Sequence, residues 1–166
     1  EVLIVGYADG NIDLVSNGGT YNMPDIIASS LIGDKGVRKI IVFDDGAYLA
    51  CGFGVVVLDL VKFEVRDTWF MTGSQDLREV LDVCLVGDKW VVATDAGVFE
   101  APVNHQFLSG ADAWTRWEDL PEAPDHYTSE IERFGEDILV TLSQGATSRL
   151  WIMRADGTSE IFPGWA

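Results

Sequence analysis

Basic residues, histidine and cysteine are scarce in this sequence. It contains 11 Lys and Arg residues against 27 Asp and Glu, which gives a formal net charge of −16. Because most of such a surface repels phosphate groups, DNA, RNA and anionic membrane surfaces are poor candidate partners. The two histidines, His105 and His126, fall in expected loops without cysteine or acidic clusters at metal-ligand spacing. We therefore expect no nucleic-acid partner and no metal or other cofactor.

Long apolar runs are missing as well. No uninterrupted apolar stretch approaches the roughly 20 residues of a membrane-spanning helix. The chain opens at Glu1 in what reads as the middle of a strand, so we expect a targeting segment to lie upstream. Apolar residues nevertheless make up 48% of the chain and aromatic residues 11%, which is enough to build a substantial core.

Catalytic signatures are also missing. The serines occur without a Gly-x-Ser-x-Gly elbow, and the glycines are dispersed rather than gathered in a phosphate-binding loop. The segment Asp9–Asp13 begins like a calcium loop, but Leu14 and Thr20 stand where an EF-hand needs glycine and glutamate. We interpret that segment as a hairpin turn. The sequence therefore predicts a protein that is not an enzyme.

What the sequence does contain is an internal repeat. Apolar runs precede four glycines that are spaced 44, 43 and 48 residues apart, namely Gly10, Gly54, Gly97 and Gly145. We predict that each glycine forms the structural turn of a hairpin, because glycine supplies the positive φ that tight turns demand. The spacing fits a four-stranded propeller blade, which takes about 40–50 residues.

The strands that precede these glycines lack polar alternation. A continuous apolar run indicates a strand that is covered on both faces, as it is when blades stack radially. One column of the repeat holds small residues that suit a crowded axis: Gly6, Ala50 and Ala93, with Thr141. Outer strands such as Glu64–Trp69 regain alternation, which indicates contact with water on one face.

We therefore predict an all-β fold, a β-propeller or propeller fragment of about four blades with four antiparallel strands each. Residues 1–166 form a single propeller segment with blade units at about 2–23, 37–70, 80–118 and 127–162. The first unit holds only the last three strands of a blade, so we expect the segment to belong to a larger propeller. No amphipathic helix is expected, and three longer stretches are interpreted as blade-to-blade connections: Met23–Val37, Pro102–Ala113 and Pro121–Tyr127.

The six tryptophans fall into two groups. Trp90 and Trp151 lie within apolar strands and are expected to be packed. Four others lie on outer strands or at the end of the chain and form the predicted recognition surface: Trp69, Trp114, Trp117 and Trp165. Because aromatic side chains dominate core burial, packing between blades is the competing interpretation for these four as well.

The two cysteines, Cys51 and Cys84, both fall inside apolar strands, in different columns of the repeat. A disulfide between blades would suit an exported protein, whereas free buried cysteines are ordinary core residues. Both alternatives remain open, because two cysteines alone do not determine their Cα separation.

Three consecutive segments resemble a known family. Residues 6–15 contain the sequence GNIDL, residues 47–60 contain GFGVVVLDL, and residues 93–98 follow as ATDAGV. These segments look like consecutive blades of the PorZ-like propeller family of the type IX secretion system, over roughly residues 2–120. Single blade motifs of this kind also occur in the propellers of two-component regulators.

The resemblance implies a function. It implies a non-catalytic interaction or scaffold module of the type IX secretion and cell-surface attachment machinery, exported to the outer-membrane surface or the periplasm. The implied partners are proteins such as sortase-complex subunits, together with a glycan or lipopolysaccharide. The alternative is the periplasmic ligand-sensing propeller of a hybrid two-component regulator. A sorting domain or a transmembrane helix in the flanking sequence would distinguish these two functions.

Overall fold

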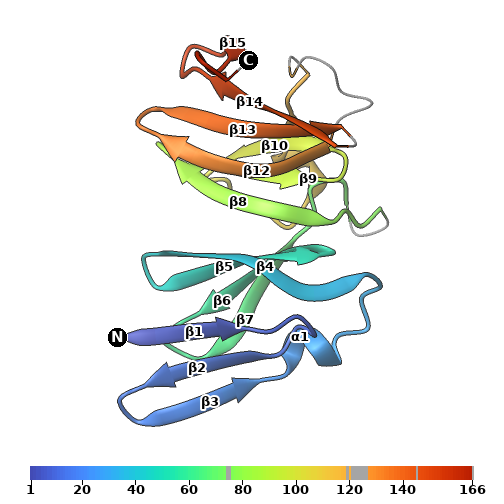
Figure 1. Cartoon of the computed structure of the whole chain (residues 1–166). Coiled ribbons are helices and arrows are strands. Elements are labelled where there is room, and N and C mark those ends of the chain that lie inside the picture. The colour runs from blue at the N-terminus through green and yellow to red at the C-terminus, as the bar shows by residue number, and fades with distance from the viewer. Residues whose placement is uncertain (74–75, 119, 121–126, 145, 166) are drawn as a thin grey trace.

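The computed structural model describes the chain except for residues 74–75, 119, 121–126, 145 and 166 (Figure 1). Almost every regular element is a β-strand, and the strands form four separate antiparallel sheets. The predicted all-β propeller fold is confirmed. Within the described residues, no helix combines the length and the apolar character needed to cross a membrane.

The first two sheets occupy the N-terminal half of the chain. Blade 1 contains β1 (Val2–Gly6), β2 (Ile12–Ser16) and β3 (Gly19–Met23). A single turn of helix follows, α1 (Asp25–Ala28). Blade 2 contains β4 (Asp34–Phe43), β5 (Gly46–Gly52), β6 (Gly54–Asp59) and β7 (Glu64–Trp69).

The other two sheets have the same up-and-down order of strands. Blade 3 contains β8 (Val80–Val86), β9 (Lys89–Thr94), β10 (Gly97–Pro102) and β11 (Thr115–Arg116), with the short 3₁₀ helix η1 (Ala111–Ala113) before β11. Blade 4 contains β12 (Tyr127–Phe134), β13 (Asp137–Gln144), β14 (Thr147–Met153) and β15 (Ser159–Ile161). Figure 1 shows the blades stacked in chain order, from blade 1 at the bottom to blade 4 at the top.

Each pair of neighbouring blades buries an apolar core between its faces. The small-residue column lies in these contacts, where Ala50 and Ala93 are fully buried. A Cβ atom added to Gly6 would lie 2.9 Å from the Cβ atom of Val37 in blade 2. The close approach of blades 1 and 2 therefore requires a residue without a side chain at this position.

The marker glycines lie at the turns between the second and third strands of the repeat. Gly10, Gly54 and Gly97 have φ angles of 88°, 154° and 117°, in the region that favours glycine. At Gly54 a Cβ atom would collide with the carbonyl oxygen of Trp69. The fourth marker, Gly145, lies outside the described residues.

Two predicted connections differ from the structure. The segment Pro102–Ala113 joins β10 to β11 inside blade 3, so its interpretation as a blade-to-blade connection is wrong. This segment leads from the end of β10 through η1 to β11, which is only two residues long. The connection predicted at Met23–Val37 is shorter in the structure, because Met23 is the last residue of β3 and β4 begins at Asp34. Of the third segment, residues 121–126 lie outside the described part of the chain.

The first strands of blades 2, 3 and 4 are joined by one polar cluster. The carboxylate of Asp82, on β8, accepts hydrogen bonds from the backbone N–H groups of Val83 (2.8 Å) and of Ile131 on β12 (3.0 Å). Lys39 on β4 places its ammonium group 3.4 Å from Asp82 and 3.4 Å from Glu132. Burial raises the pKa of Asp82, while these donors and the Lys39 charge oppose the shift. One buried carboxylate thus links three successive blades.

Candidate functional site: a cleft between blades 3 and 4

A cleft of about 680 Å³ lies between blades 3 and 4. It lies at the end of the blades that carries the turns β8–β9, β12–β13 and β14–β15, which we call the turn end (Figure 1). Its volume falls in the range of small-ligand pockets, which span about 300–1,000 Å³. The walls come from both blades, so the space is a gap in the contact between two repeats.

In the neighbouring contact, between blades 2 and 3, aromatic rings occupy this level. Tyr48 of β5 packs on Trp90 of β9, with 4.1 Å between the ring centroids. Trp69 of β7 lies 5.2 Å from Tyr48 and 5.3 Å from Trp90 by the same measure. Phe43 meets Trp90 edge-on at 6.1 Å. All these side chains belong to, or pack against, one core.

The repeat register identifies the residues that occupy the same positions one blade further on. Tyr48 pairs with Val57 across β5 and β6, and the corresponding pair on β9 and β10 is Val91 with Glu100. Trp90 pairs with Ala101, and the corresponding pair on β13 and β14 is Ile138 with Met153. The Tyr48–Trp90 ring pair is therefore replaced by Val91 and Ile138 between blades 3 and 4. Both replacements line the cleft.

The floor of the cleft is aliphatic. Val86 takes the place of Phe43, since each ends the first strand of its blade. Val86, Val91, Ile138 and Met153 all belong to the core between blades 3 and 4 and are at most 9% exposed. The cleft thus opens directly onto this core, where two aliphatic chains occupy positions that rings fill in the preceding contact.

Charged side chains surround the mouth of the cleft. Glu100 stands where blade 2 has Val57, and it accepts hydrogen bonds from Lys89 (2.9 Å) and from the indole N–H of Trp117 (3.0 Å). These bonds hold Trp117, which is half-buried, in a fixed position at one wall. Arg133 stands where blade 3 has Leu85, because each pairs with the second residue of the following strand.

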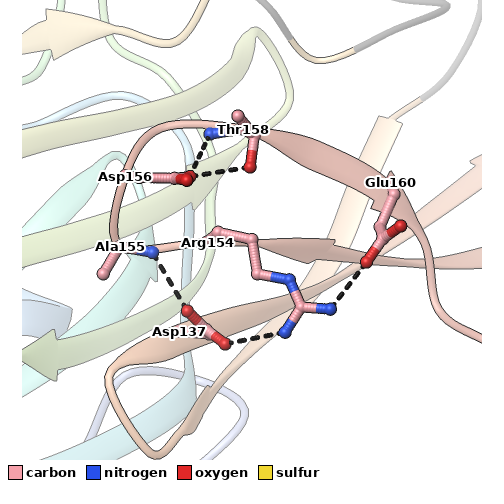
Figure 2. A network of polar contacts seen from close by, with 6 residues as sticks. All are labelled: Asp137, Arg154, Ala155, Asp156, Thr158 and Glu160. Atoms are coloured by element: carbon pink, nitrogen blue, oxygen red, sulfur yellow. Dashed lines mark hydrogen bonds and ion pairs between the residues drawn. The ribbon is translucent and has the colours of Figure 1, made fainter.

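The opposite wall is a hairpin held by its own polar contacts (Figure 2). Arg154 donates to Asp137 (3.1 Å) and to Glu160 (2.6 Å), while the second oxygen of Asp137 accepts the Ala155 N–H at 3.0 Å. Asp156 accepts both the N–H and the hydroxyl of Thr158, and these bonds lower the pKa of its carboxyl. The turn from β14 to β15 is therefore rigidly attached to the start of β13.

Arg133, at the mouth of the cleft, differs from Lys89 and Arg154. Arg133 is exposed and forms no ion pair with any residue that the structure describes, whereas the guanidinium of Arg116 lies beside Gly97 at the β9–β10 turn, at the other end of blade 3. The Nε–H of Arg133 donates to the Gly135 carbonyl at 2.9 Å, which orients the guanidinium along the rim. Arg133 lines the cleft. Three carboxylate side chains line the same cleft: Asp88, Glu118 and Glu136.

The four tryptophans of the predicted recognition surface do not lie together. Trp69 and Trp114 are buried, with 5.8 Å between their ring centroids, in the core between blades 2 and 3, so they offer no exposed surface here. Their indole N–H groups donate to Asp67 and to the Leu108 carbonyl. Trp117 lines the cleft, and Trp165 is 55% exposed near the end of the chain. Trp90 and Trp151 are packed, as expected.

The two cysteines are free and buried, so the disulfide alternative is wrong for this structure. Cys51 lies in the core between blades 1 and 2, and Cys84 lies in the core between blades 3 and 4. Burial raises the pKa of each thiol to about 12. Neither group is a ready thiolate nucleophile at neutral pH.

The segment that begins like a calcium loop forms a hairpin turn. The Asp9 carboxylate accepts the Asn11 N–H at 2.9 Å. Asp13 accepts hydrogen bonds from Tyr7 (2.8 Å) and Asn22 (2.8 Å), which lower the pKa of its carboxyl, Asn22 having the larger effect. The three polar side chains of the motif thus stabilise the turn and the adjacent strands.

His105 also lies in a loop, where its Nδ1 accepts the Phe107 N–H, and His126 lies outside the described residues.

The sequence contains a signal for the cleft that reasoning from single residues missed. Aligning the units on their glycines places Val91 below Tyr48 and Ile138 below Trp90. Each column alone looks like an acceptable core position. Only a comparison of the facing columns of neighbouring units shows that both rings are absent from the contact between blades 3 and 4.

Comparisons with known proteins agree with this architecture. The sequence profile of the N-terminal β-propeller domain of PorZ, a type IX secretion protein, matches residues 1–115. The solved structure of PorZ from Porphyromonas gingivalis, described as an essential bacterial surface component of that system, is similar at TM-score 0.77 and 26% identity. The similarity covers 96% of this chain and 20% of PorZ, so the chain spans a minor part of that protein.

Two more distant structures share the fold alone. The extracellular domain of the hybrid two-component system BT3049 from B. thetaiotaomicron has a TM-score of 0.60 at 13% identity, over 98% of this chain and 24% of that one. The computationally designed protein Ika8 has a TM-score of 0.61 at 10% identity, over 95% of this chain and 44% of that one. No curated protein matches the sequence. Since the family profile covers more than half of the residues, the chain belongs to the PorZ N-terminal β-propeller family of the type IX secretion system.

Proposed function

We propose that this chain is a non-catalytic interaction segment of a PorZ-like protein that acts in type IX secretion and in the attachment of cargo to the cell surface. The family match over residues 1–115 carries the proposal. The exported protein works at the outer-membrane surface or in the periplasm. Its partners are subunits of the sortase complex, with a glycan or lipopolysaccharide as a further ligand.

The chemistry of the buried groups supports a non-catalytic role. Asp82, the buried carboxylate among the first strands, is occupied by two backbone donors and Lys39. The buried thiols of Cys51 and Cys84 have pKa values raised to about 12. Glu100 and Arg154 at the cleft are held in ion pairs with neighbouring side chains. These contacts support a role of the named groups in packing and structure.

Co-purification tests this proposal. The complete protein that contains this segment, carrying an affinity tag, is recovered from solubilised cell envelopes, and the sortase-complex subunits are detected by mass spectrometry. An exported propeller of another family with the same tag serves as control. We expect at least one subunit to be retained by the complete protein alone. Repeated recovery without any subunit would contradict the proposal.

We also propose that the segment is part of a larger propeller. Blade 1 has three strands whereas blades 2 to 4 have four, and the edge of β1 that faces away from β2 pairs with no described strand. In blades 2 to 4 the corresponding position is filled by β4, β8 and β12. In the complete protein we expect another strand to pair with β1. Hydrogen exchange tests this, because pairing would protect the amides on the open edge of β1, and fast exchange there in the complete protein would contradict it.

A further inference from the structure

We propose that the face of blade 4 that points away from blade 3, which we call the far face, binds a further blade of the complete protein and takes up one aromatic side chain from it. That aromatic residue stands at the start of the second strand of its blade, the position that Trp90 holds in blade 3. This inference rests on the proposal that the segment is part of a larger propeller. It adds which contact the ring makes and which side chain that contact selects.

The far face is apolar, and no described blade packs on it. Its members alternate along the strands with the residues that pack against blade 3, and they include Phe134 on β12, Leu139 on β13, Leu150 and Ile152 on β14, and Phe162 after β15. None of them belongs to the cores between neighbouring blades, and Phe134 is 51% exposed. Figure 1 shows blade 4 at the top of the stack, with blade 3 on its other side.

The repeat register matches the far face to the closed contact. Phe134 ends the first strand of blade 4 as Phe43 ends that of blade 2, because each pairs with the first residue of the following strand. Phe162 takes the place of Trp69, since its N–H donates to Leu150 at 2.8 Å and Trp69 pairs with the corresponding residue of blade 2. The two rings of the far face meet edge-on, with 6.0 Å between their centroids. Blade 4 therefore keeps two of the rings with which blade 2 receives blade 3.

These rings favour an aromatic side chain on the next blade. In the closed contact, Trp90 of blade 3 meets Phe43 edge-on, with 6.1 Å between their centroids. In the open contact Val86 ends the first strand, and the residue in the place of Trp90 is Ile138. A ring at the end of the first strand thus occurs with a ring on the next blade, and an aliphatic side chain with an aliphatic one. Phe134 is a ring, so an aromatic partner completes an edge-to-face pair.

A carboxylate near the axis supports a blade as the occupant. Glu130 follows the bulge in the first strand of blade 4, as Asp82 follows the bulge in blade 3. Asp82 accepts the backbone N–H of Ile131, on the first strand of the next blade, at 3.0 Å. Glu130 is exposed, so its carboxylate is available to an N–H on the first strand of a further blade. The far face thus repeats an apolar and a polar feature by which the preceding blades hold the next blade.

Hydroxyl-radical footprinting of the complete protein tests whether the far face is covered. Mass spectrometry measures the oxidation rate of each ring in the native protein and in urea. We expect native Phe134 and Phe162 to be oxidised about fivefold or more slowly than in urea, because the further blade shields them. Phe107 is the control, since its ring is 64% exposed on the loop between β10 and β11 of blade 3. Equal rates for Phe134 in the two states would overturn the inference.

A photo-crosslinker identifies what covers the face. p-Benzoylphenylalanine in place of Phe134 should form a crosslink within one chain, to a strand that begins with Trp, Tyr or Phe. A crosslink to a second copy or to a different protein would overturn the inference. A crosslink to a helix, or to a blade with an aliphatic residue at that position, would overturn it as well.

A substitution tests the pairing of the rings. Phe134→Val gives blade 4 the residue type of Val86, and the crosslinked aromatic residue should then be oxidised about threefold or more faster. Phe107→Val is the matched control and should leave that rate unchanged. An unchanged rate in Phe134→Val would contradict the proposed contact. If this variant fails to fold, the footprint and the crosslink of the native fold decide the outcome.

The outcomes separate this inference from the proposed function. If the open edge of β1 is protected while Phe134 stays accessible, the larger propeller stands and the far face is not part of its ring contacts. If the crosslink joins the far face to a further blade but no sortase-complex subunit co-purifies, the far-face contact stands and the proposed interaction role fails.

Discussion

The contact between blades 2 and 3 and the contact between blades 3 and 4 are built from the same strands of the same repeat, yet one is closed and the other is open. In the closed contact Tyr48, Trp69 and Trp90 form a continuous aromatic cluster. In the open contact Val91 and Ile138 take the ring positions, and the cleft lies beside them. A repeat can therefore keep its backbone register while replacing ring packing with a cleft, because the register fixes which columns face each other.

Trp90→Ala should give the largest loss of stability and break the closed contact. Trp90 is fully buried among three other rings, so its removal should lower the free energy of unfolding by about 3–5 kcal/mol. Ile138→Ala, at the equivalent position of the open contact, should cost about 2 kcal/mol because the cleft already removes part of its packing. Urea unfolding of the purified protein measures both. Equal losses would contradict the distinction between the two contacts.

Asp82→Asn should give the next largest loss of stability, because Asp82 joins the first strands of the blades on both sides of blade 3. An amide has a single acceptor oxygen, so the substitution leaves the buried N–H of Val83 or of Ile131 without its acceptor and should cost about 1–3 kcal/mol. Hydrogen exchange should increase in β4 and in β12 alike, since the polar cluster links both. A change confined to one of these strands would show that the two contacts also differ near the axis.

The pH dependence of this variant has a definite sign. Burial raises the pKa of Asp82 in the folded protein, so the folded state holds the proton more tightly than the unfolded state. The stability that this group contributes is complete below about pH 4 and is lost as the pH rises through the folded pKa. The advantage of the native protein over Asp82→Asn should shrink as the pH rises from about 4. Unfolding midpoints across that range measure it, and a growing advantage would contradict the assignment.

Filling the open contact should raise the free energy of unfolding, by less than the preceding substitutions lower it. Val91→Tyr with Ile138→Trp should stabilise the protein by about 1 kcal/mol, the contribution typical of an added aromatic pair. The single substitution Ile138→Trp is the matched control and should gain less, because its ring lacks the partner. Thermal unfolding of both variants measures the difference. A double variant that is less stable than the native protein would show that the cleft has no room for the pair.

The two cysteines should show the smallest difference between the contacts, which is a difference in the rate at which each thiol is labelled. Both thiols have a pKa raised to about 12 by burial, so both should react slowly with a neutral thiol reagent at pH 8. Cys84 is 6% exposed in the open contact, whereas Cys51 is fully buried in the core between blades 1 and 2. We expect Cys84 to be labelled first, and mass spectrometry of the labelled peptides measures the order. Faster labelling of Cys51 would contradict the greater accessibility of the open contact.

The period of the repeat predicted the fold because turns and covered strands are local features. Gly10, Gly54 and Gly97 lie at turns with positive φ, where a side chain is strained, and such positions are visible in one sequence. The length of a connection is less visible. Pro102–Ala113 lies within blade 3 because β11, the two-residue strand that follows it, pairs with β10, and nothing in its composition separates it from a connection between blades.

The orientation of Trp69 depends on a feature that no periodicity reveals. Val65 and Trp69 are an even number of residues apart, so regular alternation places them on one face of β7. The strands β6 and β7 shift register between Val57 and Leu58, which turns Val65 toward blade 1 and Trp69 toward blade 3. Trp69 therefore lies in the core between blades 2 and 3 and not on the predicted recognition surface. Trp117, at the equivalent place on blade 3, keeps its access to the cleft because the facing ring is absent.

A crystal structure of the variant Val91→Tyr/Ile138→Trp tests the central claim most directly, namely that the cleft is the space of a missing ring pair. The two introduced rings should pack on each other between blades 3 and 4 at a separation close to the 4.1 Å of Tyr48 and Trp90, with the blades in place. Rings turned out into solvent, or blades forced apart with the cleft still open, would contradict it.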